Sequence, residues 1–442
     1  MSMLENISER ILDNGLKVIC LQKTDAPLVA VQLWYKTGSV NERDGIRGIS
    51  HFIEHMMFRG SENVAPEEHA RRINDVGGHC NAFTAEDMTA YINSVPADHL
   101  EMVLDLEADR MRSLTLDTAI LETERKVLVE EYHTYMNNPV MKAFLEFRGE
   151  LFKGHPYAIS SLGSLQDIQT ITSEDCRDYY DKWYSPANAV CIVVGDFESE
   201  DHVFGLVDKK LGVFESSSRG ANLEQKDIPE VQIGQGPFAM KHRVDFDVPL
   251  FIIGYPAPKS SDKDALPLEM LQLIVSHGES SRLYREMVRK RSLAVMAGGI
   301  NHFLRLSGMS LFFAAFTPDV SVKRIEEALN EQIENAKRGA VTALEVEKVK
   351  NGTLTNRIFE LYSAENICQR IGFSEAIEGD YRLWVERLEA LENLTVERLI
   401  EVAEKYWDIK NRYSLYLQPK KVNPLLYVAG FARRLFQGKG KA

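Results

Sequence analysis

The sequence predicts an α+β fold made of two homologous halves, each a mainly antiparallel sheet covered by helices. Three observations lead to this prediction. The chain has 442 residues, more than one ordinary domain contains. Residues 218–236 combine Gly, Pro and polar residues with few large apolar ones, which is typical of a linker. The same order of strand-like and helix-like segments occurs on both sides of it, so we expect domains at 1–217 and 237–442.

Each half begins with strands that lead into a helix. Residues 16–21 and 28–35 are rich in β-branched and aromatic side chains, and a helical apolar spacing follows over 48–58. In the second half, residues 250–255 have the composition of a strand and 265–275 have the spacing of a helix. The two halves therefore share their first elements.

The elements that follow agree as well. A helix and two strands are expected from residue 69 onward, and the same series is expected from residue 283. Helices without Gly or Pro near their starts are expected from residues 118 and 342. This agreement predicts an internal duplication.

The composition restricts the partners and the location. Hydrophobic residues make up 44% of the chain and charged residues 26%, which is typical of soluble globular proteins. A formal net charge of −13 argues against nucleic acid or an anionic membrane and favours basic or neutral ligands. The five cysteines form no CxxC pair, and the N-terminal residues show neither a signal peptide nor a transit peptide. With no run of about 18 apolar residues either, we expect a cytoplasmic protein.

The segment HFIEH, residues 51–55, has the chemistry of a metal site. His51, Glu54 and His55 lie three and four residues apart, so on a helix both imidazoles reach one ion and the carboxylate points into the same space. The order H-x-x-E-H is the signature of inverzincins, a class of zinc peptidases. The alternative is a pair of ordinary surface or core histidines. An apolar face for docking this helix is provided by Ile49, Phe52, Ile53 and Met56.

Zinc in a hydrolase needs three protein ligands and an open fourth position, so two histidines leave one ligand to be found. The helix expected from residue 118 is acidic, but helical spacing alone does not choose its ligand, and an acidic run is more often a solvated face. Glu124, Val127 and Glu131 are expected to share one helical face. The candidate third ligands are Glu122, Glu124, Glu130 and Glu131.

Here the sequence resembles the M16 peptidases, which include pitrilysin, insulin-degrading enzyme and the mitochondrial processing peptidase. HFIEH is followed 76 residues after its second histidine by a Glu inside ERKVLVEE. The resemblance extends over most of the chain, through GGHCNAFTAEDMTAY from residue 77, HPY from 155, YSPANAVCIVVGDF from 184 and DALPLEMLQLIVSHGESSRLY from 264. The chain is most similar to the branch whose members pair two such chains.

The resemblance implies a zinc endopeptidase and assigns roles to residues. Glu131 would be the third zinc ligand beside His51 and His55, Glu54 the general base, and Glu124 an acid that supports the ligands. The second half has no H-x-x-E-H, so one Zn²⁺ per chain is expected. A peptide substrate would bind along the edge strand that contains Asn81, Ala82 and Phe83.

The chain departs from the family pattern at one point. Many M16 peptidases carry an Arg and a Tyr in the second half that grip the substrate, but Val288 and Val295 stand at those positions here. By the resemblance, this chain forms half of a pitrilysin-type clamshell. A homologous subunit would then supply the missing Arg and Tyr, so we expect this chain to be the catalytic subunit of a heterodimer. A self-sufficient homodimeric oligopeptidase and a non-catalytic scaffold of the same fold are the alternatives.

Overall fold

The computed structural model describes residues 6–215, 228, 231, 236–421 and 423–428. The chain forms two compact units. Unit 1 contains Met1–Thr134, Ile159–Pro229 and Asn356–Glu386, and unit 2 contains Tyr135–Ala158, Glu230–Thr355 and Arg387–Ala442. Each unit therefore draws on both halves of the sequence. The expected linker at 218–236 lies for the most part outside the described residues, so the boundaries at 217 and 237 stay a prediction.

Unit 1 is built on a mixed sheet whose described strands follow the order β1-β2-β6-β3-β5-β4. β2 and β6 are parallel, and the other neighbours are antiparallel. β3 is buried from its second residue to its last, as expected for a central strand covered on both faces. The strands are β1 (Ser8–Ile11), β2 (Lys17–Gln22), β3 (Leu28–Tyr35), β4 (His79–Thr84), β5 (Thr89–Pro96) and β6 (Ala189–Gly195).

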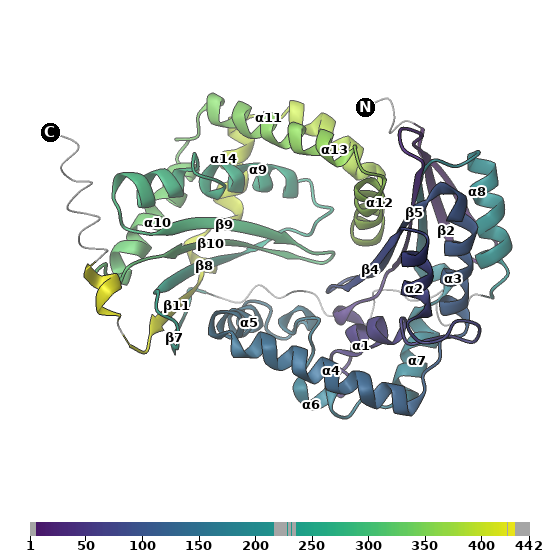
Figure 1. Cartoon of the computed structure of the whole chain (residues 1–442). Helices are drawn as coiled ribbons and strands as arrows, with labels where there is room; N and C mark the ends of the chain where they lie inside the picture. Colours follow the sequence, from purple (N-terminus) through teal and green to yellow (C-terminus); the bar gives the residue numbers. More distant parts are fainter. Residues whose placement is uncertain (1–5, 216–227, 229–230, 232–235, 422, 429–442) are drawn as a thin grey trace. The chain divides into compact units, whose positions relative to one another are not determined.

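One face of this sheet carries a layer of helices (Figure 1). Alternate residues of β3, among them Val31 and Leu33, enter one core with the apolar sides of these helices. The expected helix at 48–58 is confirmed as α1, and the expected strand at 28–35 is confirmed as β3. The helices are α1 (Ile49–Met56), α2 (Glu68–Asp75), α3 (Leu100–Arg112), α6 (Leu165–Ile168), α7 (Ser173–Trp183) and α8 (Glu200–Val207).

The other face of the unit 1 sheet is covered by α12 (Ala364–Phe373), which comes from the second half of the sequence. The Cys368 thiol donates to the Ala30 carbonyl at 3.5 Å. A Cβ at Gly372 would overlap the indole ring of Trp34, so helix and sheet approach closely here because the residue is a glycine. The sheet is therefore buried on both sides.

Unit 2 repeats this architecture. Its described strands follow the order β7-β11-β8-β10-β9, and only β7 and β11 among them are parallel. Order and direction match β2, β6, β3, β5 and β4 of unit 1, which confirms the two homologous halves. The strands are β7 (Phe238–Val244), β8 (Leu250–Ala257), β9 (Met296–Phe303), β10 (Gly308–Ala315) and β11 (Tyr413–Pro419).

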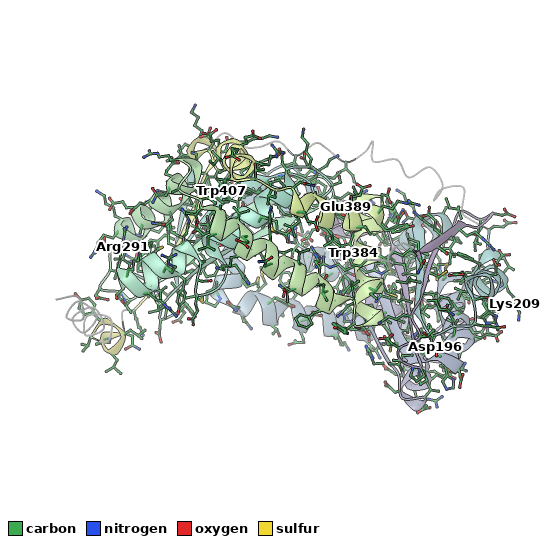
Figure 2. All side chains as sticks on the ribbon, turned by 90° about the horizontal axis from the view of Figure 1, so that it is seen from above. Asp196, Lys209, Arg291, Trp384, Glu389 and Trp407 are labelled. Carbon is green, nitrogen blue, oxygen red and sulfur yellow. The ribbon has the colours of Figure 1, made fainter. Side chains whose placement is uncertain are left out.

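The core of unit 2 is mainly apolar and contains a few hydrogen-bonded polar side chains. Figure 2 labels Trp407, which is fully buried at the end of α14 and donates its Nε1–H to Ser310 Oγ at 3.1 Å. The expected apolar helix at 265–275 is confirmed as α9, and the helix expected after residue 283 is a π-helical segment, Tyr284–Lys290. The helices of this core are α9 (Ala265–Ser276), α10 (Val322–Lys337) and α14 (Val396–Tyr406).

The second face of the unit 2 sheet is covered by α5 (Pro139–Leu151), a helix from the first half of the sequence. Its Phe147 packs edge-on against Tyr413 of β11, with ring centroids 6.4 Å apart. A Cβ at Gly254 of β8 would come within 2.7 Å of the Phe147 ring. The two halves thus exchange equivalent helices, α5 and α12.

The remaining long helices run from one unit into the other, namely α4 (Thr118–Asn137), α11 (Ala343–Glu360) and α13 (Arg382–Glu392). Both α4 and α11 begin where the sequence predicts a helix. Among the described helices, none has the length and apolar character needed to cross a membrane.

Candidate metal centre

The helix α1 is anchored at both its apolar face and its first turn. Ile49, Phe52, Ile53 and Met56 are all fully buried, as their spacing predicts. Gly48 precedes the helix with a φ of 102°, a conformation that favours glycine. The buried Glu42 carboxylate accepts the backbone N–H groups of Gly48 at 2.7 Å and Ser50 at 2.9 Å. Burial raises the pKa of Glu42 to about 7, although these hydrogen bonds oppose the shift.

Two histidines of α1 and one glutamate of α4 come together. His51 Nε2 lies 3.7 Å from Glu131 Oε2, and His55 Nε2 lies 3.8 Å from the same oxygen. The two imidazole rings meet edge to face with centroids 4.8 Å apart. The ligand atoms of His51, His55 and Glu131 all lie within 4.8 Å of one another. Among the residues that the structure describes, this is the group of three side chains that could hold a metal ion.

These separations fit a tetrahedral zinc site. Ligand distances of about 2.0 to 2.2 Å place the ligand atoms of such a site roughly 3.4 Å from one another. The observed 3.7 and 3.8 Å need only small side-chain adjustments. Burial, together with the nearby His55, lowers the pKa of His51 to about 4, so its imidazole is neutral at physiological pH, as a zinc ligand must be.

The structure distinguishes the acidic residues of α4. Glu124 is buried, and its Oε2 lies 3.3 Å from His55 Nδ1, the ring nitrogen that faces away from Glu131. Its Oε1 lies 2.8 Å from Arg59 Nε, and Arg59 also pairs with Glu67. Glu122 instead pairs with Arg125, and Glu130 is exposed. Glu131 is therefore the α4 carboxylate that faces both histidines.

The side chains of α4 differ in how deeply they are buried. Val127 has the helical spacing to share a face with Glu124 and Glu131, and its side chain is 44% exposed. Leu121, Glu124 and Leu128 are buried together, because residues three and four apart repeat along one stripe. Glu124 therefore belongs to the apolar stripe by which α4 docks, and Val127 lies outside it.

Glu54 is held in place from the edge of the sheet. The Thr84 hydroxyl, at the end of β4, donates to Glu54 Oε2 at 2.6 Å. Burial raises the pKa of Glu54, with a further contribution from the negative charge of Glu131, while the Thr84 hydrogen bond and His55 oppose the rise. A carboxylate beside the metal ligands, with its pKa moved toward neutrality, suits a general base.

β4 itself is the last strand of its sheet among the described residues. The backbone N–H of Ala82 donates to the Asn81 side-chain oxygen at 2.9 Å, so this N–H faces the open edge rather than β5. Phe83 turns to the opposite face from Thr84 and meets the Trp34 ring at 5.6 Å. Asn81, Ala82 and Phe83 thus lie on the outermost described strand of the sheet, and the last residue of that strand, Thr84, contacts Glu54.

Two protein-family models match the chain. A family model described as insulinase (peptidase family M16) matches residues 17–163, and one described as the peptidase M16 inactive domain matches 170–353. The chain belongs to the M16 peptidase family. The first M16 match contains every residue of the candidate metal centre, and the second covers most of the half without H-x-x-E-H.

Several similar proteins match more than nine tenths of the chain. The zinc protease PqqE of Helicobacter pylori is 29% identical over 415 residues, covering 92% of both chains. The crystal structure of a protease from Helicobacter pylori superposes with a TM-score of 0.86 at 27% identity, over 93% of this chain and 99% of that one. The periplasmic protease PqqL of Escherichia coli shows the same fold, with a TM-score of 0.76 at 19% identity, over 99% of this chain but 50% of PqqL.

The positions of the family's substrate-gripping pair carry no polar group here. Val288 is buried in the core of unit 2, within the π-helical segment, and Val295 is exposed just before β9. Neither side chain donates or accepts a hydrogen bond. Valines therefore occupy the two positions at which the resemblance to M16 peptidases implies an Arg and a Tyr.

Three residues that support the site were not predicted from the sequence. Thr84 carries a usable signal, because it continues the strand that contains Asn81, Ala82 and Phe83. Arg59 lies four residues after His55, a spacing that places it near the same helical face. Glu42 carries no local signal, since its contact with α1 depends on how the chain folds back between residues 43 and 47.

Proposed function

We propose that this chain is a zinc-dependent endopeptidase that cleaves unfolded peptides, with one zinc ion held by His51, His55 and Glu131. The observation that carries the proposal is the convergence of these three side chains at 3.7 to 3.8 Å, beside the Glu54 carboxylate. Membership of the M16 family and the name of the zinc protease PqqE support the same chemistry.

The residues divide the work of hydrolysis. The zinc ion, when bound, would lower the pKa of a coordinated water toward about 7 and polarise the scissile carbonyl. Glu54 would accept the proton of the attacking water and deliver it to the leaving amine, with Thr84 fixing the carboxylate by its 2.6 Å hydrogen bond. Glu124 would orient His55 through Nδ1. No covalent intermediate with the protein is needed.

Unfolded peptides are the proposed substrates because of the open edge of β4. A peptide that adds to this edge as an extra strand would form backbone hydrogen bonds along Asn81, Ala82 and Phe83. A folded domain has few segments free to pair in this way. The formal charge of −13 favours basic or neutral peptides.

We further propose that the chain acts as the catalytic subunit of a heteromer. Val288 and Val295 leave the gripping pair of the family absent, so a homologous subunit would supply it. This chain matches 50% of the length of PqqL. PqqL is therefore long enough to contain two such folds in one chain.

Metal analysis and peptide cleavage together test the proposed chemistry. The zinc-loaded wild type should contain one zinc per chain, and His51→Ala or His55→Ala should lose zinc and turnover together. Glu54→Gln should keep the zinc and lose kcat, because the amide no longer accepts the proton.

The Glu54→Gln variant is decisive. Normal turnover by this variant at full zinc content would show that Glu54 is not the base. A wild type that binds no zinc at all, tested by mass spectrometry under native conditions, would favour the non-catalytic scaffold.

A further inference from the structure

A pocket of about 330 Å³ lies in unit 1, on the face of the sheet opposite to α1. It is bounded by the loop before β3, the first residues of β3, and the first turn of α12. His79, the first residue of β4, and Ser94, its partner on β5, complete the wall. The pocket therefore opens beside the edge strand, at the end away from Glu54.

The alternation of β4 relates this pocket to the edge. Thr84 points to the α1 face, where it holds Glu54, whereas Phe83 points to the α12 face, where it meets Trp34. His79 lies four residues before Phe83, and residues an even number apart in a strand point to the same face. His79 therefore also faces α12 and the pocket. A peptide strand paired with β4 would present alternate side chains to these same two faces.

The spacing along β4 indicates which side chain of a paired peptide, counted from the scissile bond, would enter the pocket. Thr84 and His79 are five residues apart, and a strand advances by about 3.4 Å per residue. The pocket thus lies roughly 17 Å along the strand from the end that carries Glu54. A side chain of a paired substrate would enter it about five residues from the bond that is cut.

The charges of the pocket favour a cation. Glu365 Oε2 accepts the Ser94 hydroxyl at 2.7 Å and lies 2.7 Å from His79 Nε2, and the Glu365 side chain is 30% exposed. Asp25 at the rim is exposed and pairs with Lys23 at 2.7 Å. Lys23 and Asp25 thus pair with each other at the rim, which leaves the Glu365 carboxylate as the anionic group that faces the pocket beside His79 and Ser94.

The positive end of α12 does not reverse this balance. The Ser363 hydroxyl already caps the helix by accepting the backbone N–H of Asn366 at 3.4 Å. Glu365 lies in the first turn, where its charge offsets the helix dipole. An anionic ligand would therefore meet a capped helix end and a carboxylate.

The apolar part of the pocket suits a long side chain. Leu28 is exposed at the start of β3, and Tyr362 is 70% exposed just before α12. An aliphatic stem would cover Leu28, and its cationic head would reach Glu365 and the Tyr362 ring. Lys and Arg have this combination of stem and charge.

We propose that this pocket is a subsite for a Lys or Arg side chain of a peptide paired with β4, about five residues from the scissile bond, with Glu365 as the anionic contact. The subsite rests on the proposed function, because the pairing with β4 is part of it. It makes Glu365 a residue that selects substrates without taking part in the chemistry.

The test measures binding and turnover separately. A cleaved parent peptide without basic residues is varied by placing one Lys at each position from three to seven residues on either side of the scissile bond. Dissociation constants are measured by fluorescence anisotropy on zinc-loaded Glu54→Gln protein, and KM and kcat are measured on the wild type. We expect one position, four to six residues from the bond, where Lys lowers both Kd and KM by about 3- to 10-fold with kcat unchanged.

Variants of the pocket complete the design. Glu365→Gln should abolish the preference for Lys, and Glu365→Lys should replace it by a preference for Glu at the same position. Tyr362→Ser, at an exposed site where folding is not at risk, should weaken it. Glu389→Gln is the matched control, because Glu389 is an exposed glutamate on α13 that does not line the pocket (labelled in Figure 2). It should leave the preference intact.

The outcomes separate the two proposals. Turnover with no Lys preference at any position, or a preference that survives in Glu365→Gln, would overturn the subsite and leave the peptidase standing. Failure of every peptide to bind would overturn the subsite as well. A Lys preference in binding without turnover by the wild type would support the subsite and contradict the proposed peptidase activity.

Discussion

The buried carboxylate of Glu124 shows how a single residue can fix a metal ligand. It contacts the Nδ1 atom of His55 with one oxygen and Arg59 with the other. A carboxylate that accepts the Nδ1 proton leaves the lone pair of Nε2 for the metal, on the side of Glu131.

Glu124→Ala should therefore weaken zinc binding or turnover by about 10- to 100-fold, the usual range for partners of metal ligands. Zinc affinity measured by chelator competition, together with kcat, would show the loss. Glu130→Ala is the control, because Glu130 lies on the same helix, six residues after Glu124, and is exposed. Equal behaviour of the two variants would make Glu124 only a structural acid.

At this scale the sequence predicted the histidines and their apolar face from local spacing alone. It could not choose Glu131 over Glu122, Glu124 or Glu130, because helical spacing describes one helix and the choice depends on how two helices meet. Only the resemblance to M16 peptidases separated Glu131 from its neighbours.

At the scale of elements, the close approach of α12 to the sheet is the feature most sensitive to volume. Gly372 stands where a Cβ would overlap the Trp34 ring, and Trp34 Nε1 is already committed to Gln32 at 2.9 Å. The ring has little freedom to move away. Even one added methyl group should be felt here.

Gly372→Ala should lower the free energy of unfolding by about 1 to 3 kcal/mol through overpacking. Gly352→Ala, on α11, provides the opposite case, because a Cβ there meets no atom within 4 Å. The alanine at 352 should stabilise the helix by about 0.5 to 1 kcal/mol. Denaturant unfolding of the two variants beside the wild type would show the opposite signs, and a stabilised Gly372→Ala would contradict the tight packing.

The elements themselves were predictable because their signals are local. β3 has the bounds that its β-branched and aromatic run suggests, and α9 begins at the residue where its apolar spacing begins. The destinations of α5 and α12 were not predictable. Nothing in either helix records that its apolar residues pack on a sheet from the other half of the sequence, since long-range partners leave no local period.

For the whole molecule, the missing gripping pair leads to a prediction about assembly. The purified chain should bind zinc but cleave peptides poorly, because Val288 and Val295 provide no hydrogen-bond donor to a substrate. A homologous subunit that carries the Arg and Tyr should raise kcat by about 10² to 10³, the range seen when such donors are removed from hydrolytic sites. Turnover at constant zinc content, with and without the candidate subunit, gives the measurement.

Full activity of the isolated chain, unaffected by any added subunit, would instead favour the homodimeric oligopeptidase. Sedimentation of the active species would then give the mass of two identical chains.

The exchange of α5 and α12 also has a consequence for how the protein is made. The sheet of unit 1 and its metal ligands are complete by residue 195, but α12, which covers the second face of that sheet, ends at Phe373. At about 5 to 20 residues per second, a ribosome needs roughly ten seconds or more to reach it. During that interval Ala30 and Trp34 lack the cover that α12 provides, so the second face of the sheet stays exposed to solvent. The last stage of unit 1 folding must therefore wait until most of the second half has been translated.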